Sequence, residues 1–146
     1  MQTRAMTATA EGTVPMSGPR THISGVGRVI VPVSDQDRAL GFYLQTLGME
    51  KRADVPSFDG DRWVEVAPAG ETTVLALVRP RGGMFGHPGV DTRISLSSTD
   101  IEADHAALRQ AGADVDEEIL RLPPPAPPMF FLRDPDRNTL QVTQAP

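Results

Sequence analysis

The sequence predicts an α+β fold made of two tandem copies of one βαβββ pattern in a single domain. A chain of 146 residues suits one ordinary domain. A strand-like segment that ends in aspartate occurs twice, 65 positions apart, and each copy runs into a helix that ends at glycine. We expect a disordered tail at 1–22 and one domain at 23–144. Within it, module one spans about 23–80, a linker about 81–90 and module two about 91–144.

The first strand of each copy shows the alternation of a half-buried strand. Val29, Val31 and Val33 occupy every second position of the first copy, and Ile94 and Leu96 do so in the second. Period two with one apolar face is typical of a strand that packs on one side only. The strands therefore begin near residues 28 and 93.

Each strand leads into a predicted helix. The segments Ser34-x-x-Asp37 and Thr99-x-x-Glu102 have the form of a capping box, so we expect helices to begin there. Gly48 and Gly112 mark the helix ends, because glycine accepts the left-handed conformation of a C-terminal cap. The apolar stripes at helical spacing are Ala39, Leu40, Tyr43, Leu44 and Leu47 in the first helix and Ile101, Leu108 and Ala111 in the second.

Three strands are predicted after each helix, separated by turn sequences such as Asp59-Gly60-Asp61. The proline-rich segment 123–128 lacks backbone donors, so we expect an extended piece at the rim instead of a central strand. The strands are expected near 50–55, 62–67, 73–78, 114–122, 129–133 and 139–143.

Two motifs resemble signatures of the vicinal-oxygen-chelate superfamily (glyoxalase / bleomycin resistance protein / extradiol dioxygenase-like). The first is Val31-Pro-Val-Ser-Asp-Gln-Asp-Arg-Ala-Leu-Gly-Phe-Tyr43 followed by Leu47-Gly48. The second is Phe130-Phe-Leu-Arg-Asp-Pro-Asp-Arg-Asn-Thr-Leu140, in which Arg137 stands where the family usually has glycine. The resemblance covers about residues 24–144. It implies that the modules form an open, curled mixed sheet around a cavity, with the helices on the outer face.

The resemblance also implies four positions for ligands of a divalent metal, on the first and last strands of each module. These positions hold Arg28, Ala76, Arg93 and Gln141. Only Gln141 offers an oxygen, and a guanidinium has no acceptor lone pair. A catalytic metal site needs about three protein ligands. We therefore expect no metal cofactor, since three of the four positions are lost.

The histidines and the overall composition argue against other metal sites, nucleic-acid binding and membrane insertion. The chain has no cysteine, and His22, His87 and His105 form no closely spaced pair, so no alternative metal site is indicated. The net charge of -5 argues against non-specific binding to nucleic acid or to an anionic membrane surface. No apolar run is long enough to cross a membrane. A cysteine-free chain suits the cytoplasm.

We expect a small organic ligand in the cavity or in a groove between subunits. Two inward-facing arginines at related positions favour an anionic group such as a carboxylate or phosphate. Alternatively they pair with an acidic side chain or reach solvent, and the acidic balance of the chain suits a cationic compound instead. These alternatives stay open. The predicted ligand-binding residues are Arg28, Arg93, Gln141, Glu65, Trp63 and Ser95.

The main hypothesis is a metal-free small-molecule-binding protein, which we expect to form a homodimer because superfamily members usually associate across exposed sheet edges. The alternative is a metal-dependent or metal-free lyase, isomerase or ring-cleaving dioxygenase. In a metal-free enzyme Glu65 is the candidate general base, a role that predicts a position near Arg28 or Arg93 and a raised pKa. A third hypothesis is a structural or regulatory protein whose pocket is filled.

Overall fold

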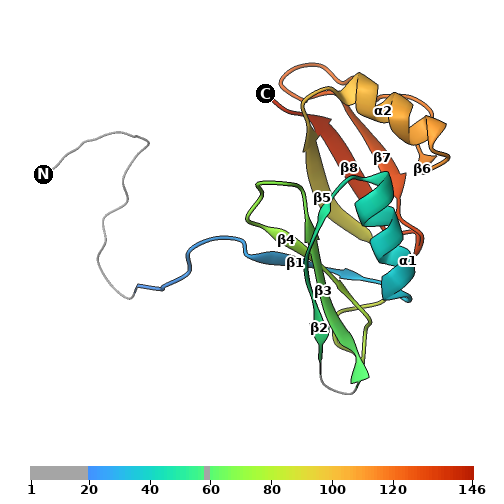
Figure 1. Cartoon of the computed structure of the whole chain (residues 1–146). Helices are drawn as coiled ribbons and strands as arrows, with labels where there is room; N and C mark the ends of the chain where they lie inside the picture. The colour runs from blue at the N-terminus through green and yellow to red at the C-terminus, as the bar shows by residue number, and fades with distance from the viewer. Residues whose placement is uncertain (1–19, 58–59) are drawn as a thin grey trace, which may run out of the picture.

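The computed structural model describes residues 20–57 and 60–146, so almost all of the tail predicted at 1–22 lies outside the described residues. Two βαβββ modules follow one another (Figure 1). Module one contains β1 (Arg28–Pro32), α1 (Gln36–Leu40), the π-helical turn η1 (Gly41–Thr46), β2 (Glu50–Pro56), β3 (Arg62–Ala67) and β4 (Val74–Val78). Module two contains β5 (Asp91–Ser98), α2 (Ile101–Gln110), β6 (Asp114–Val115), β7 (Met129–Arg133) and β8 (Thr139–Gln144).

Each module has its own four-stranded mixed sheet. The strand orders are β1-β4-β3-β2 and β5-β8-β7-β6, with the first and last strand of each module parallel. Ile30 lies opposite Ala76 in module one, and Ser95 lies opposite Gln141 in module two. Both members of the second pair stand 65 positions after their counterparts. The repeat in the sequence is therefore a repeat in structure, and the predicted α+β tandem fold is confirmed.

The helices pack on one face of each sheet and bury the alternating apolar residues. Val31 of β1, Val33 just after this strand and Tyr43 of η1 have no exposed surface. Removing such side chains from water is the main favourable contribution to folding. The opposite side of each sheet carries no helix, and we call it the helix-free face. The core also contains Val64, Val66, Leu75, Leu77, Ile101, Leu108, Phe130, Leu132, Leu140 and Val142.

The helix caps differ from the prediction by one residue. Asp35 and Asp100 are the N-caps, and their carboxylates accept hydrogen bonds from the backbone N–H groups of Arg38 at 3.0 Å and Ala103 at 3.1 Å. The predicted caps Ser34 and Thr99 are wrong. An aspartate in this position satisfies an otherwise unpaired N–H and favours the positive end of the helix dipole.

The strand predicted at 114–122 is also wrong in length. Only Asp114–Val115 pairs with β7, followed by an isolated pair between Leu120 and Met129. Side chains of α2 take the intervening carbonyls: the His105 Nε2 atom lies 2.8 Å from the carbonyl oxygen of Asp116, and Arg109 donates to that of Glu117. These contacts replace the sheet ladder. No helix among the described residues is long and apolar enough to cross a membrane.

A buried polar junction connects the modules. The Tyr43 hydroxyl donates to Asp134 Oδ2 at 2.8 Å, and Asn138 Nδ2 donates to the same atom at 2.9 Å and to the carbonyl of Pro32 at 2.7 Å. The Oδ1 atom of Asn138 accepts the N–H groups of residues 89–90. Figure 1 shows α1 beside the ends of β7 and β8. The motif that ends the chain thus has a structural role, which is to hold module two against module one.

Candidate functional site

Three of the predicted site residues meet on the helix-free face of module one. Glu65 of β3 lies opposite Ala76 of β4. Its Oε2 atom accepts a hydrogen bond from Arg28 Nε at 3.0 Å and another from Trp63 Nε1 at 2.9 Å. The Glu65 side chain is 13% exposed, whereas that of Arg28 is 55% exposed. One mostly buried carboxylate therefore orients an indole ring and a guanidinium that both reach the surface.

The electrostatics of this cluster hold Glu65 in its ionised form. The indole N–H of Trp63 lowers the pKa of Glu65, and Arg28 lowers it further, while burial acts in the opposite direction. A carboxylate with a lowered pKa is a weaker base. Of the two conditions for Glu65 as a general base, its place beside Arg28 is met. Its pKa shifts in the opposite direction to the raised value that the role requires.

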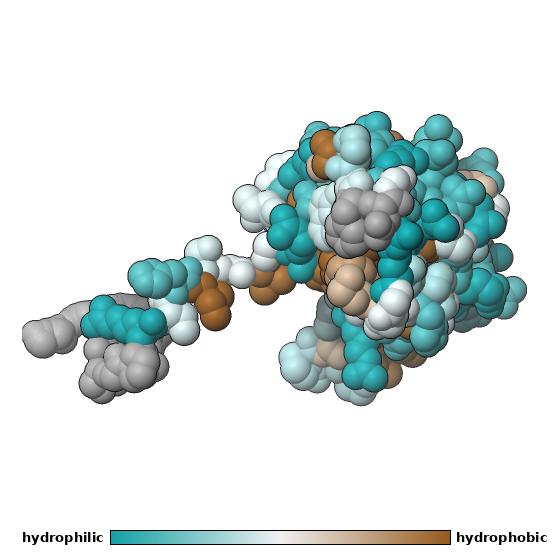
Figure 2. All heavy atoms as spheres, turned by 90° about the horizontal axis from the view of Figure 1, so that it is seen from below, coloured by the Kyte–Doolittle hydropathy of each residue, from teal (hydrophilic) through white to brown (hydrophobic). Residues whose placement is uncertain are grey.

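An apolar surface adjoins this cluster. Val55 of β2 lies opposite Trp63, and the Phe85 ring stands edge-on to the indole with centroids 6.4 Å apart. Val55 is 51% exposed and Phe85 is 38% exposed. We call Val55, Trp63 and Phe85 the Trp63 platform. Seen from the β2–β3 end, the surrounding surface is mostly hydrophilic with small hydrophobic areas (Figure 2).

The helix-free face of module two carries different side chains, because Phe131 stands opposite Gln141 where Glu65 stands opposite Ala76 in module one. Ser95 and Gln141 lie opposite each other. The Ser95 hydroxyl is 3.0 Å from the hydroxyl of Thr143, and Gln141 Nε2 donates to the sulfur of Met129 at 3.1 Å. The predicted site residues thus divide between two sheets. The sequence indicated no special role for Phe85, since it lies in a glycine-rich linker without periodicity.

Arg93 is placed differently from Arg28. Arg28 lies opposite Val74 in a regular ladder, but Arg93 sits in an irregularity of β5 between Asp91 and Ser95, with φ 57°. Its backbone N–H is bonded to the carboxylate of Asp91 at 3.0 Å. The residue is exposed, and its side chain makes no ion pair with any residue in 20–57 or 60–146. The two arginines are related in sequence but occupy different backbone environments.

Comparison with known proteins identifies the family. A family model described as Glyoxalase/Bleomycin resistance protein/Dioxygenase superfamily matches residues 25–142. The chain belongs to this superfamily. Among curated proteins, it is 30% identical over 92 residues to the uncharacterized protein YetH of Bacillus subtilis (strain 168), covering 63% of this chain and 76% of YetH.

Solved structures with similar folds support this assignment. TnmS3, an antibiotic binding protein from Streptomyces sp. CB03234, is similar with a TM-score of 0.75 and 34% identity, covering 87% of this chain and all of TnmS3. A superfamily member from Sphaerobacter thermophilus DSM 20745 has a TM-score of 0.77 and 33% identity, covering 84% of this chain and 98% of that one.

Three of the four metal-ligand positions that the resemblance implies hold side chains that do not fit a divalent metal, and the fourth, Gln141, keeps an amide oxygen. Arg28 is paired with Glu65, Ala76 is fully buried, and the Gln141 amide contacts a methionine sulfur. The ring of His105 packs on a phenylalanine with centroids 4.9 Å apart, so it is an edge-of-core residue. Within the described ranges, no three His, Cys, Asp or Glu side chains converge on one point. Permanent cations at ligand positions repel a metal ion.

Proposed function

We propose that this chain is a metal-free small-molecule-binding protein that holds a planar, largely apolar organic compound on the Trp63 platform. The observation that carries the proposal is the convergence of Trp63 and Arg28 on one carboxylate oxygen of Glu65, beside exposed apolar side chains. Ligand sites characteristically combine apolar walls with a few oriented polar groups. The antibiotic-binding description of TnmS3, which is 34% identical, supports a small-molecule ligand.

The chemistry of the platform defines the compound further. Trp63 and Phe85 offer ring faces and edges for aromatic contact. Glu65 engages only the Nε atom of Arg28, so the terminal nitrogens are left to donate to a carboxylate or another acidic oxygen. Although Glu65 offsets the charge of Arg28, these terminal N–H groups can only donate hydrogen bonds. A ring system with one anionic or strongly accepting oxygen therefore suits the site better than a cation.

The chain's only tryptophan makes binding directly measurable. We expect 2-naphthoate, as a probe, to quench Trp63 fluorescence saturably and to give a heat of binding. Arg28→Ala and Trp63→Ala should each weaken binding by about tenfold, the loss of one charge-assisted or aromatic contact. Arg79→Ala is the matched control, because Arg79 is 56% exposed and also pairs with a carboxylate, Asp61.

Equal affinities of Arg28→Ala and Arg79→Ala for naphthoate would overturn the placement of the ligand. Calorimetry is needed for Trp63→Ala, since that variant lacks the fluorophore. A screen of aromatic antibiotics against the intact chain then extends the measurement to larger compounds.

The absence of a metal cofactor is part of the proposal. Its support is the unsuitable donor set, and the lowered pKa of Glu65 counts against the alternative of a metal-free enzyme that uses this residue as a base. We expect elemental analysis of the purified protein to find no stoichiometric Mn, Fe, Ni or Zn, and these ions to leave the thermal midpoint unchanged. A tightly held stoichiometric metal would favour the metal-dependent lyases, isomerases and dioxygenases.

A homodimer in the cytoplasm completes the proposal. The strand orders leave β1, β2, β5 and β6 at sheet edges within the described chain, and such edges favour association. The cysteine-free sequence supports a reducing compartment. Light scattering should give a mass twice that of the 15.7 kDa chain, and a monomer mass at all concentrations would contradict the dimer.

A further inference from the structure

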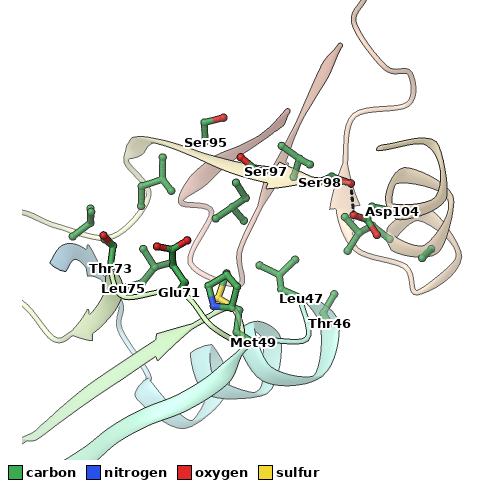
Figure 3. A pocket seen from close by; sticks show the side chains of 17 residues that line it. Thr46, Leu47, Met49, Glu71, Thr73, Leu75, Ser95, Ser97, Ser98 and Asp104 are labelled. Carbon is green, nitrogen blue, oxygen red and sulfur yellow. Dashed lines mark hydrogen bonds between the residues drawn. The ribbon is translucent and has the colours of Figure 1, made fainter. Parts of the chain in front are cut away.

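A cavity of about 450 Å³ lies between the modules and is distinct from the Trp63 platform (Figure 3). Its apolar lining comes from the helix-bearing sides of both sheets and from α2. In Figure 3, Ser98 and Asp104 stand on one side, and Glu71 and Thr73 on the other. The volume is within the range of small-molecule sites. Among the apolar residues of its wall are Leu47, Met49, Leu75, Leu96, Leu108 and Val142.

The internal repeat shows why the space is there. Tyr43 and Leu108 each stand eight residues after their helix N-cap. The carbonyl of each accepts the N–H that follows the helix end, from Met49 at 3.0 Å and from Ala113 at 3.1 Å. Leu108 is therefore the counterpart of Tyr43. The cavity lies where the repeat would place a second copy of the Tyr43–Asp134–Asn138 junction.

The second junction lacks the groups that fill the first. In the first, a phenol ring occupies the space between modules and its hydroxyl reaches a carboxylate. In the second, Leu108 is shorter than a tyrosine. Thr73, at the position that corresponds to Asn138, donates its hydroxyl at 2.6 Å to the carbonyl of Val26 in its own module. Protein interiors are normally close-packed. Because Leu108 does not fill the place that a tyrosine ring fills in the first junction, the space between the modules is open to another occupant.

The charged residues of the cavity lining indicate the charge of a ligand that would fit there. Glu71 and Asp104 are on the lining, which contains no lysine, arginine or histidine. Asp104 Oδ2 accepts the hydroxyl of Ser98 at 2.5 Å, which orients the carboxylate at the cavity's edge. An apolar wall with carboxylates at its rim complements an apolar body with one cationic group.

We propose that the inter-module cavity is a second ligand site, one that binds a small arylalkylamine. Its ring packs against Leu75 and Leu108 in the place that corresponds to the Tyr43 ring, and its ammonium group faces Asp104 or Glu71. This site is separate from the Trp63 platform, and its ligand has the opposite charge to the one proposed there.

Calorimetric titration of the full chain with phenethylamine tests the site. We expect saturable binding of one equivalent per chain, and no binding of phenylacetate, which has similar size and the opposite charge. Asp104→Asn should weaken binding about tenfold, since a charged hydrogen-bond partner is lost. Leu108→Tyr should abolish binding by filling the cavity with the ring that the first junction already contains. Leu108→Met, which keeps the side-chain volume, should retain it.

The outcomes separate this inference from the proposed function. Trp63→Ala should leave phenethylamine binding unchanged while it impairs naphthoate binding. The amine site would be overturned if phenylacetate bound as tightly as phenethylamine. It would also be overturned if a folded Leu108→Tyr protein bound phenethylamine with unchanged affinity. A change from dimer to monomer on Leu108→Tyr substitution would also overturn it, because the cavity would then be covered by a second copy of the chain.

Discussion

Glu65 is the side chain that organises the proposed site. It fixes Arg28 and the Trp63 indole through a single oxygen while remaining 13% exposed. Trp63 and Glu65 lie on one face of β3, because residues two apart in a strand point the same way. The sequence did not select between solvent, a ligand and Glu65 as the partner of Arg28, since that pairing spans 37 positions.

The lowered pKa of Glu65 predicts a pH-dependent contribution to stability. Because the folded-state pKa lies below the unfolded value, the unfolded chain binds more protons between the two, and the stabilisation disappears as pH falls through the folded pKa. We expect Glu65→Gln to cost about 1–2 kcal/mol at pH 7. The gap should narrow below about pH 4, the ordinary range of a glutamate.

Urea unfolding at pH 7, 5 and 3 measures this difference. Glu50→Gln is the control, because Glu50 also pairs with an arginine, Arg52, but is 54% exposed. Exposed ion pairs contribute little to stability, so its effect should be small at every pH. A Glu65→Gln cost as large at pH 3 as at pH 7 would contradict the assigned ionisation.

The secondary-structure elements show where local pattern is sufficient. The period of Val29, Val31 and Val33 predicted β1, because one buried face dictates that pattern. The cap of α1 was misplaced by one residue because Ser34 has another partner: its hydroxyl donates to Asp136, 102 positions away, at 2.5 Å. Similarly, β6 is short because side chains of α2 bind the carbonyls of Asp116 and Glu117. Long-range contacts of this kind are not visible in local sequence.

The corrected cap of α2 can be tested against the predicted one. Asp100→Ala should destabilise the protein by about 1 kcal/mol, because the Ala103 N–H loses its acceptor. Thr99→Ala should change the free energy of unfolding by less than about 0.5 kcal/mol, as expected for an exposed residue without a capping bond. Denaturant unfolding of both variants decides whether Asp100 or Thr99 is the N-cap. A larger loss of stability for Thr99→Ala would support the predicted capping box instead.

At the scale of the whole molecule, two similar modules meet at two junctions that differ from each other. The junction around Tyr43, Asp134 and Asn138 is a buried polar network. The other junction contains the inter-module cavity, although the 65-residue repeat places corresponding residues at both. The sequence identified the motif from Asp134 to Asn138 by resemblance. It could not reveal that the motif's partner is Tyr43, 91 positions earlier, because the relative placement of the modules determines that contact.

The polar junction should therefore hold the modules together. Burial and the Asp134 carboxylate raise the pKa of Tyr43, so its hydroxyl stays protonated and donates at any pH in which the protein is folded. Tyr43→Phe leaves a buried carboxylate short of one donor, and we expect a loss of about 1–3 kcal/mol. Thr73→Val, which removes a hydroxyl of the other junction at the position that corresponds to Asn138, should cost less than about 1 kcal/mol because that group is not fully buried.

A double-mutant cycle with Asp134→Asn isolates the contact from the general effects of each substitution. Chemical unfolding of the two single variants and the double variant should give a coupling energy of about 0.5–3 kcal/mol, since the hydroxyl and the carboxylate are in direct contact. Additive costs would mean that the hydroxyl contributes nothing through Asp134. The modules would then be held by apolar packing and by the hydrogen bonds of the Asn138 side chain to the backbone.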